Sequence, residues 1–171
     1  MVEYNYRERG QKVLLAKTNT DTRDGHKIIY SRIGLSKECA LLSEVVQLSD
    51  AELKEYAAVI VDEIQFASAE ECDFLAHIVD DLNIPVMTYG LRTDFQLHLF
   101  PGSRRMLELA DEIHEIKTMC WCSRKAICNA RYNANGIVRE GEQVMLGAND
   151  NYIALCRKHF LSGELKKQTN E

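Results

Sequence analysis

Residues 57–63 read AAVIVDE, and this stretch decides the fold that the sequence predicts. Its apolar residues are typical of a strand buried on both faces of a parallel sheet, and the strand runs directly into Asp62 and Glu63. Burying an unpaired carboxylate costs roughly several kcal/mol or shifts its pKa until the group is neutral, so two acids in succession point to a function. The alternative is a pair of solvated acids where a strand meets its loop.

The flanking segments alternate between strand and helix patterns. Strands are predicted at QKVLLAK (11–17) and IPVMTYGL (84–91), and short helices at DAELKEY (50–56) and RRMLELAD (104–111). The clearest helix covers residues 68–83, where Ser68 and Glu71 form a capping box. Its apolar face comprises Cys72, Leu75, Ile78, Val79 and Leu82. Strand, helix and strand with a crossover of this length predict an α/β fold with a parallel sheet.

The position of the two acids suggests their chemistry. Ligands of parallel sheets bind at the carboxyl ends of the strands, which is where Asp62 and Glu63 fall. Asp62 suits the role of holding Mg²⁺ through water while the metal bridges nucleotide phosphates. Glu63 is then available to act as a base.

Composition excludes several classes of protein. The net charge of -5 argues against a nucleic-acid backbone as the main partner, because such a partner requires a basic face. No apolar run is long enough to span a membrane, and the charged N-terminus does not read as a signal peptide. We therefore expect a cytoplasmic protein without membrane contact, whose 6 cysteines are reduced.

Four residues in the last third of the chain have the spacing of a structural zinc site. Cys120 and Cys122 form one pair, Cys156 and His159 form another, and residues 133–136 look like a hairpin tip between them. Two close pairs across a hairpin-sized insert predict a tetrahedral Zn²⁺ filled by protein ligands.

The remaining cysteines have other interpretations. Cys128 competes for one position among the zinc ligands, and a buried packing thiol is its alternative. Cys39 and Cys72 lie in apolar patterns and are expected in the core.

Taken together, these motifs resemble a known family. The runs are VIVDEIQF (59–66), IPVMTYGLRTDFQLHLFPGS (84–103), KTMCWCSRKA (117–126) and EGEQVMLGANDNYIALCRKHF (140–160). In this order they closely resemble the cytosolic, zinc-containing thymidine kinases, especially the bacterial branch with a C-x-C pair. The resemblance covers nearly the whole chain, from residue 4 onward, and leaves an unrelated zinc-ribbon protein as a remote alternative.

The resemblance implies a fold with two domains. Residues 1–118 would form a P-loop NTPase-like parallel sheet with helices on both faces, which binds the nucleotide. Residues 119–171 would form a small zinc-ribbon or lasso domain. Zinc would be structural, fixing both ends of a loop that closes over the nucleoside. The family also implies a homotetramer.

The resemblance assigns the nucleotide site by position. Glu63 would take the proton from the 5′-hydroxyl of thymidine, and Asp62 would belong to the Mg-ATP site. Ile64 and Gln65 complete the ATP-binding segment DEIQ. Asp21 and Arg23, in TDTRD (20–24), are candidates for metal and phosphate contacts, and a solvated loop is their alternative.

The nucleoside site is assigned in the same way. Residues 136–156 resemble the lasso that closes over the thymine. The substrate-binding candidates are Leu91, Phe95, Phe100, Met145 and Tyr152. Packing in the core is the alternative for the apolar members of this set.

One feature departs from the family pattern. A P-loop enzyme needs G-x-x-x-x-G-K-[ST] to cradle the phosphates, and residues 1–171 contain no such segment. The family places it at the very start, so the resemblance implies that roughly 25 residues precede residue 1. Two hypotheses follow. The chain is an ATP-dependent thymidine kinase of deoxynucleoside salvage recorded without its N-terminus, or it is an inactive nucleoside-binding or assembly module.

Overall fold

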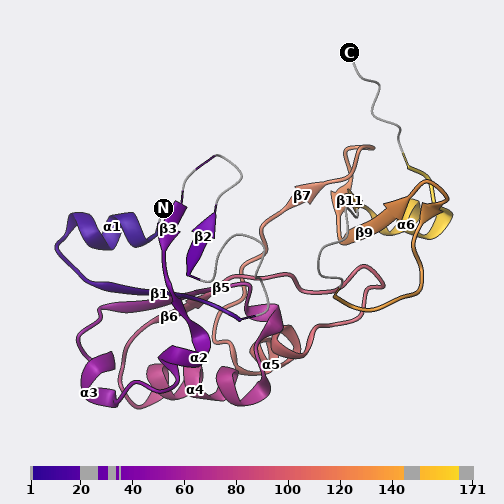
Figure 1. Ribbon diagram of the computed structural model, residues 1–171. Coiled ribbons are helices and arrows are strands. Elements are labelled where there is room, and N and C mark those ends of the chain that lie inside the picture. Colours follow the sequence, from indigo (N-terminus) through magenta and orange to yellow (C-terminus); the bar gives the residue numbers. More distant parts are fainter. Residues whose placement is uncertain (1, 20–26, 31–33, 35, 145–150, 166–171) are drawn as a thin grey trace. The chain divides into compact units, whose positions relative to one another are not determined.

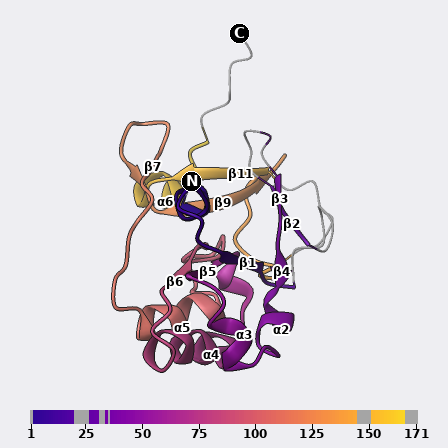
Figure 2. The ribbon, with the colours of Figure 1, turned by 90° about the vertical axis from the view of Figure 1, so that its left-hand side faces the viewer.

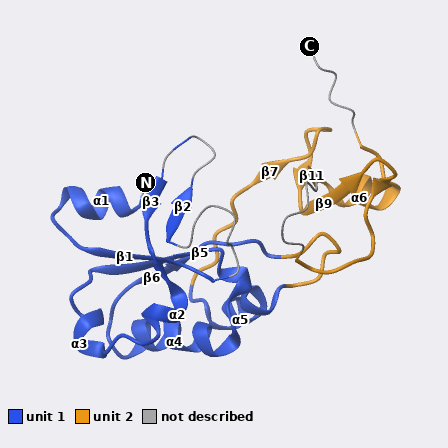
Figure 3. Ribbon diagram, in the orientation of Figure 1, with its two compact units in different colours: residues 1–92, 100–111 blue, residues 93–99, 112–171 orange. Residues whose placement is uncertain are grey.

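The chain forms two compact units (Figure 3). The computed structural model describes residues 2–19, 27–30, 34, 36–144 and 151–165. Unit 1 comprises residues 1–92 and 100–111, and unit 2 comprises residues 93–99 and 112–171. Each unit encloses its own cluster of buried hydrophobic side chains, so each has its own core.

Unit 1 is built on a parallel sheet of β1 (Val13–Lys17), β4 (Ala40–Leu41), β5 (Ala58–Asp62) and β6 (Val86–Thr88), in the order β4-β1-β5-β6. The predicted parallel α/β sheet is therefore confirmed. β5 is internal, and residues 58–61 are buried, as its apolar run predicts. The third predicted strand is shorter than the expected range 84–91.

Helices flank this sheet (Figures 1 and 2). α2 (Leu42–Val45), α3 (Asp50–Leu53), α4 (Ala69–Asp80) and α5 (Pro101–Leu109) lie on one side, and α1 (Val2–Glu8) lies on the opposite side. The core between α2–α4 and the sheet contains alternate residues of β1 and β5 together with buried helix residues: Leu14, Ala16, Val59, Val61, Leu42, Leu53, Leu75 and Ile78. This alternation follows from the period of two along a strand.

The local signals for α4 act as predicted. Ser68 Oγ accepts a hydrogen bond from the Glu71 backbone N–H, and the Glu71 carboxylate accepts one from the Ser68 N–H. Cys72, Leu75 and Ile78 are buried on one face. Such a capping box satisfies helix N–H groups that have no partner within the helix.

A short hairpin of β2 (Ile28–Tyr30) and β3 (Ser36–Glu38) belongs to unit 1 and was not predicted. Its three-residue strands are too short to show a period. Lys17, at the end of β1, is buried and donates a hydrogen bond from Nζ to the carbonyl of Ile28, 3.0 Å away.

Unit 2 is an antiparallel sheet of β9 (Cys128–Asn133), β10 (Gly136–Ile137) and β11 (Asn151–Leu155), in the order β10-β9-β11. A second hairpin, β7 (Thr118–Met119) with β8 (Lys125–Ala126), and a helix, α6 (Arg157–Ser162), complete it. Gly136 pairs with Asn133, which confirms the predicted hairpin tip.

Among the residues that the structure describes, no helix combines the length and the apolar character needed to cross a membrane.

Candidate functional site

The carboxyl end of β5 carries the two acids. Glu63 is the residue after the strand and has a left-handed backbone conformation, with φ of 55°. Its N–H donates to Asp62 Oδ1 at 2.9 Å, and its carbonyl accepts a hydrogen bond from Thr18 Oγ1 at 3.1 Å. A left-handed backbone at a non-glycine residue is uncommon and is concentrated at functional sites. The chain therefore turns sharply at Glu63, and the hydrogen bond from Thr18, the residue after β1, holds this turn in place.

Gln65 fixes the Glu63 side chain. It lies in the 3₁₀ helix η1 (Ile64–Phe66) and is fully buried. Its Nε2 donates to Glu63 Oε2, and its Oε1 accepts a hydrogen bond from the Leu91 N–H at 3.0 Å. One amide thus ties the Glu63 carboxylate to the segment that follows β6. An oriented carboxylate at the end of a central strand can accept a proton from a bound hydroxyl group.

Two glycines allow this close packing. A Cβ at Gly102, near the start of α5, would lie 2.2 Å from the Ile64 carbonyl oxygen, and one at Gly90 would lie 2.5 Å from Gln65 Oε1. Both distances are shorter than a Cβ contact allows, and at Gly102 the opposing atoms are backbone, so a side chain there would force the backbone apart. The sequence contains both glycines, but no local pattern indicates which backbone atoms they approach.

Four of the predicted nucleotide-binding residues follow one another in the sequence, at the end of β5 and in η1. Asp62, Glu63, Ile64 and Gln65 run from the end of β5 through η1. Ile64 and Gln65 are buried, whereas Asp62 and Glu63 are partly exposed. The acids are therefore the members of this segment whose side chains reach solvent. Asp21 and Arg23 lie outside the described residues.

The predicted nucleoside-binding residues divide between the units. In unit 1, Leu91 is 44% exposed, whereas Phe100 is buried with its ring edge-on to Phe66 at 5.5 Å between centroids. In unit 2, Phe95 is buried and Tyr152 is 47% exposed. The burial of Phe95 and Phe100 agrees with core packing, and a role beside a ligand is an additional proposal. Met145 lies outside the described residues.

The four predicted zinc ligands converge in unit 2. The ligand atoms of Cys120, Cys122, Cys156 and His159 all lie within 4.8 Å of one another. Cys120 Sγ and Cys156 Sγ are 3.4 and 3.6 Å from His159 Nδ1, and Cys122 Sγ is 3.9 Å from Cys156 Sγ. A tetrahedron with Zn–S of about 2.3 Å and Zn–N of about 2.0 Å has edges of about 3.5 to 3.8 Å. The donor set and its dimensions therefore fit a closed zinc site.

The electrostatics of Cys120 also favour metal binding. Burial raises the pKa of its thiol, but hydrogen bonds from the Cys122 and Cys156 backbones, from His159 and from the Cys122 side chain together lower the pKa to about 6. The lowered pKa favours the thiolate, which is the form that binds metal ions.

Two further residues hold the ring of His159, and the sequence interpretation did not include them. Trp121 stacks on the imidazole with 4.1 Å between centroids and an interplanar angle of 11°. The Glu164 carboxylate lies 3.7 Å from His159 Nε2, and the Glu164 carbonyl accepts a hydrogen bond from Trp121 Nε1. Nδ1 therefore faces the sulfurs while Nε2 faces a carboxylate, an arrangement typical of ligating histidines.

The other three cysteines are buried and lie outside this group. Cys128 is buried in β9 opposite Leu155 and is not a member of the converging group. Cys39 and Cys72 are buried, as predicted. Burial raises the pKa of Cys72 to about 11, which keeps that thiol protonated.

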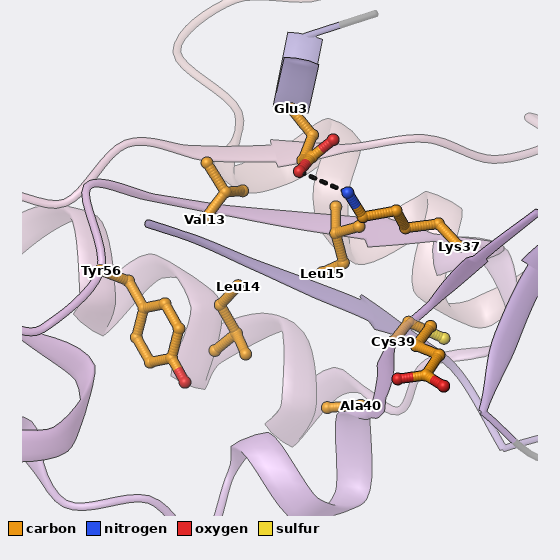
Figure 4. A pocket seen from close by; sticks show the side chains of 9 residues that line it. Glu3, Val13, Leu14, Leu15, Lys37, Cys39, Ala40 and Tyr56 are labelled. Carbon is orange, nitrogen blue, oxygen red and sulfur yellow. Dashed lines mark hydrogen bonds and ion pairs between the residues drawn. The ribbon is translucent and has the colours of Figure 1, made fainter. Parts of the chain in front are cut away.

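An open hollow of about 320 Å³ lies elsewhere in unit 1 (Figure 4). Its walls come from α1, β1, the β3–β4 segment and Tyr56, and they include Val13 and Leu15. Glu3 and Lys37 form an ion pair of 2.7 Å in this lining. Because none of the predicted site residues lines the hollow, it is separate from the site at the end of β5.

Comparison with known proteins places the sequence in a family. The thymidine kinase family model matches residues 1–160. A thymidine kinase of Legionella pneumophila (strain Paris) is 46% identical over 171 residues, covering 96% of this chain and 82% of the relative. Those of Agrobacterium fabrum (strain C58 / ATCC 33970) and Streptococcus pyogenes serotype M6 are 46% and 43% identical, with 92% and 96% of this chain covered and 85% and 89% of the relatives. The chain therefore belongs to the thymidine kinase family.

Proposed function

We propose that this protein is a thymidine kinase that transfers the γ-phosphoryl group of ATP to the 5′-hydroxyl of thymidine. The observation that carries the proposal is the similarity to thymidine kinases over nearly the whole chain, a range that includes Asp62, Glu63 and the four predicted zinc ligands. Such an enzyme would serve deoxynucleoside salvage for DNA synthesis.

In the proposed mechanism Glu63 is the general base. It takes the proton from the 5′-hydroxyl as that oxygen attacks the γ-phosphorus, and the bond to the β–γ bridging oxygen breaks. The contact with Gln65 supports this role, because it limits the directions in which the carboxylate can point. General bases typically contribute about 10²- to 10⁴-fold to the rate.

Asp62 and its neighbours form the proposed nucleotide-binding segment. Mg²⁺ would neutralise phosphate charge when bound, and Asp62, at the carboxyl end of β5, would hold it. The backbone of Ile64 and Gln65 would contact ATP, and Asp21 and Arg23 remain candidates for metal and phosphate contacts. Leu91, Phe95, Phe100, Met145 and Tyr152 are the proposed contacts of thymidine.

The proposed Zn²⁺ is structural. With Cys120, Cys122, Cys156 and His159 all assigned as ligands, no position is left for a water or a substrate. We further propose a cytoplasmic homotetramer, and two functional domains, 1–118 for the nucleotide and 119–171 for zinc and the lasso.

The test separates phosphoryl transfer from binding. We expect Glu63→Gln to lower the rate of thymidine monophosphate formation by at least about 10²-fold while calorimetry shows unchanged thymidine binding. Glu70→Gln, at an exposed acid in the first turn of α4, is the control and should retain activity. A wild-type rate in Glu63→Gln would show that Glu63 is not the general base.

A second candidate is a nucleoside-binding or assembly module without transferase activity. Tight thymidine binding with no turnover by the folded, zinc-loaded chain would support this candidate. Turnover that depends on Glu63 would eliminate it, and a chain that binds no thymidine would overturn both functions.

A further inference from the structure

Arg131 has an unusual position for an arginine. It lies in β9 of unit 2, and only 1% of its surface is exposed. Arginine is almost never fully buried unless specific contacts compensate for the lost hydration of its charge. Its surroundings therefore indicate what the residue does.

The guanidinium group contacts both aromatic residues of unit 2 that are proposed to bind thymidine. Its central carbon lies 3.9 Å from the centroid of the Phe95 ring and 5.6 Å from that of Tyr152. Its Nε donates a hydrogen bond to the Tyr152 hydroxyl group at 3.1 Å. Tyr152 is paired directly opposite Arg131 on the neighbouring strand β11. One side chain thus fixes the ring of Phe95 from one face and the ring of Tyr152 from its hydroxyl end.

The guanidinium group of Arg131 also contacts the segment that follows β10. Arg131 Nη1 donates to the Glu142 carbonyl oxygen at 3.2 Å. Arginine suits this position because its planar group stacks on a ring while its separate N–H groups reach two acceptors, which a lysine ammonium cannot do in the same way.

Phe95 is also held by contacts that do not involve Arg131. The buried Asp94 accepts hydrogen bonds from the N–H groups of Gln96 and His98 and from Gln143 Nε2, at 2.8 to 2.9 Å. Residues 93–99 therefore have their own anchor in unit 2. Replacing Arg131 should change how the two rings are oriented without releasing this segment.

We propose that Arg131 is a positioning residue for nucleoside binding, which orders the rings of Phe95 and Tyr152 for contact with thymidine. This inference rests on the proposed function, under which those two residues contact the nucleoside. Arg131 acts through them and takes no part in the transfer of the phosphoryl group.

The decisive measurement is the dissociation constant of thymidine for the full chain, compared with that of ATP. We expect Arg131→Lys to weaken thymidine binding by about tenfold or more, because hydrogen bonds to charged groups and ring stacking are lost together. Binding of ATP and zinc content should stay within about twofold of the wild type. Arg157→Lys, at an exposed arginine of α6, is the control and should leave both dissociation constants unchanged.

A double-mutant cycle distinguishes positioning from a general loss of structure. Tyr152→Phe keeps the ring and removes the hydroxyl group that accepts from Arg131. If the two side chains act as one unit, Tyr152→Phe weakens thymidine binding in the wild type but adds little in Arg131→Lys. Independent, fully additive effects would overturn the proposal.

The remaining outcomes are also informative. Wild-type thymidine affinity in Arg131→Lys would overturn the positioning role and leave the proposed function intact. A wild-type chain that does not bind thymidine would overturn both. If Arg131→Lys fails to fold, Tyr152→Phe still tests the contact, since unchanged thymidine binding in this variant would show that the Arg131–Tyr152 hydrogen bond does not position the nucleoside.

Discussion

At the end of β5, the amide of Gln65 satisfies two groups at once, the Glu63 carboxylate and the Leu91 N–H. We predict that Gln65→Leu lowers the free energy of unfolding by about 1 to 3 kcal/mol, because it removes from a fully buried position the amide that bonds both the Leu91 N–H and the Glu63 carboxylate. Urea unfolding of both proteins measures this loss. The same change at Gln47, which is exposed, should have little effect. Equal losses at the two positions would contradict the role given to Gln65.

The roles of some residues could be predicted from the sequence, and the roles of others could not. Asp62 and Glu63 were predicted at a strand end because a buried strand must stop where charges begin. The four metal ligands were predicted to converge because their spacing brings two pairs across a hairpin. Gln65, Gly102 and Arg131 owe their roles to partners distant in the chain, to which no local pattern points.

Among the elements, α3 and α4 are joined by His77. Its Nδ1 lies 2.6 Å from Asp81 Oδ2, just after α4, and its Nε2 lies 3.3 Å from Asp50 Oδ1 at the start of α3. Hydrogen bonding to Asp81, and next to Asp50, raises the pKa of His77 above its ordinary value. The protonated imidazole therefore stabilises the fold below the unfolded pKa of about 6.5, and this contribution is lost as the pH rises through the folded pKa.

The protonated His77 predicts that the stability difference between the wild type and a His77 variant depends on pH. We expect His77→Gln to be less stable than the wild type at about pH 5.5, with the difference shrinking towards about pH 9. Urea unfolding at both pH values measures it, and His114→Gln, at an 85% exposed side chain, serves as the comparison. A difference that grows with pH would show that the protonated His77 does not join the two helices.

The start of α5 packs against η1 through Gly102. We predict that Gly102→Ala destabilises the protein by about 1 to 3 kcal/mol, because the new methyl group would meet the Ile64 carbonyl oxygen and force the backbone apart. Thermal unfolding monitored by circular dichroism measures the change. Arg104→Ala, at an exposed position of the same helix, controls for the substitution of a helical residue. If Gly102→Ala is as stable as the wild type, Gly102 does not pack as closely against the Ile64 carbonyl oxygen as described.

Elements with strong local signals were predicted, whereas the two short hairpins were not. α4 has a capping box and a continuous apolar face, and β5 has an unbroken apolar run. The hairpins β2–β3 and β7–β8 have strands of two or three residues, which cannot show a period. α5 begins at Pro101, earlier than predicted, because proline fits the first position of a helix.

For the whole molecule, two separate cores predict that metal removal affects one unit more than the other. Trp121 is the single tryptophan of the chain and stacks on His159, so its fluorescence reports on the metal ligands. We expect a strong chelator to shift the Trp121 emission to longer wavelength and to lower the melting temperature of unit 2, since metal binding and folding are coupled in small sites.

The same experiment has an internal reference. The core between the sheet and the helices of unit 1 contains none of the four ligands, so the circular dichroism signal of these helices should persist after chelation. Added Zn²⁺ should restore the emission. Unchanged emission and melting after complete removal of bound metal would contradict a structural role for the site.

The chain passes between its two units three times, after residues 92, 99 and 111. A fragment that begins at residue 112 would therefore contain Arg131 but not Phe95, the ring on which its guanidinium group stacks. Recombination that exchanges only the C-terminal part between relatives would separate these two residues. Residues 112–171 are thus not a portable module by themselves, and protein engineers who transplant them need to carry residues 93–99 as well.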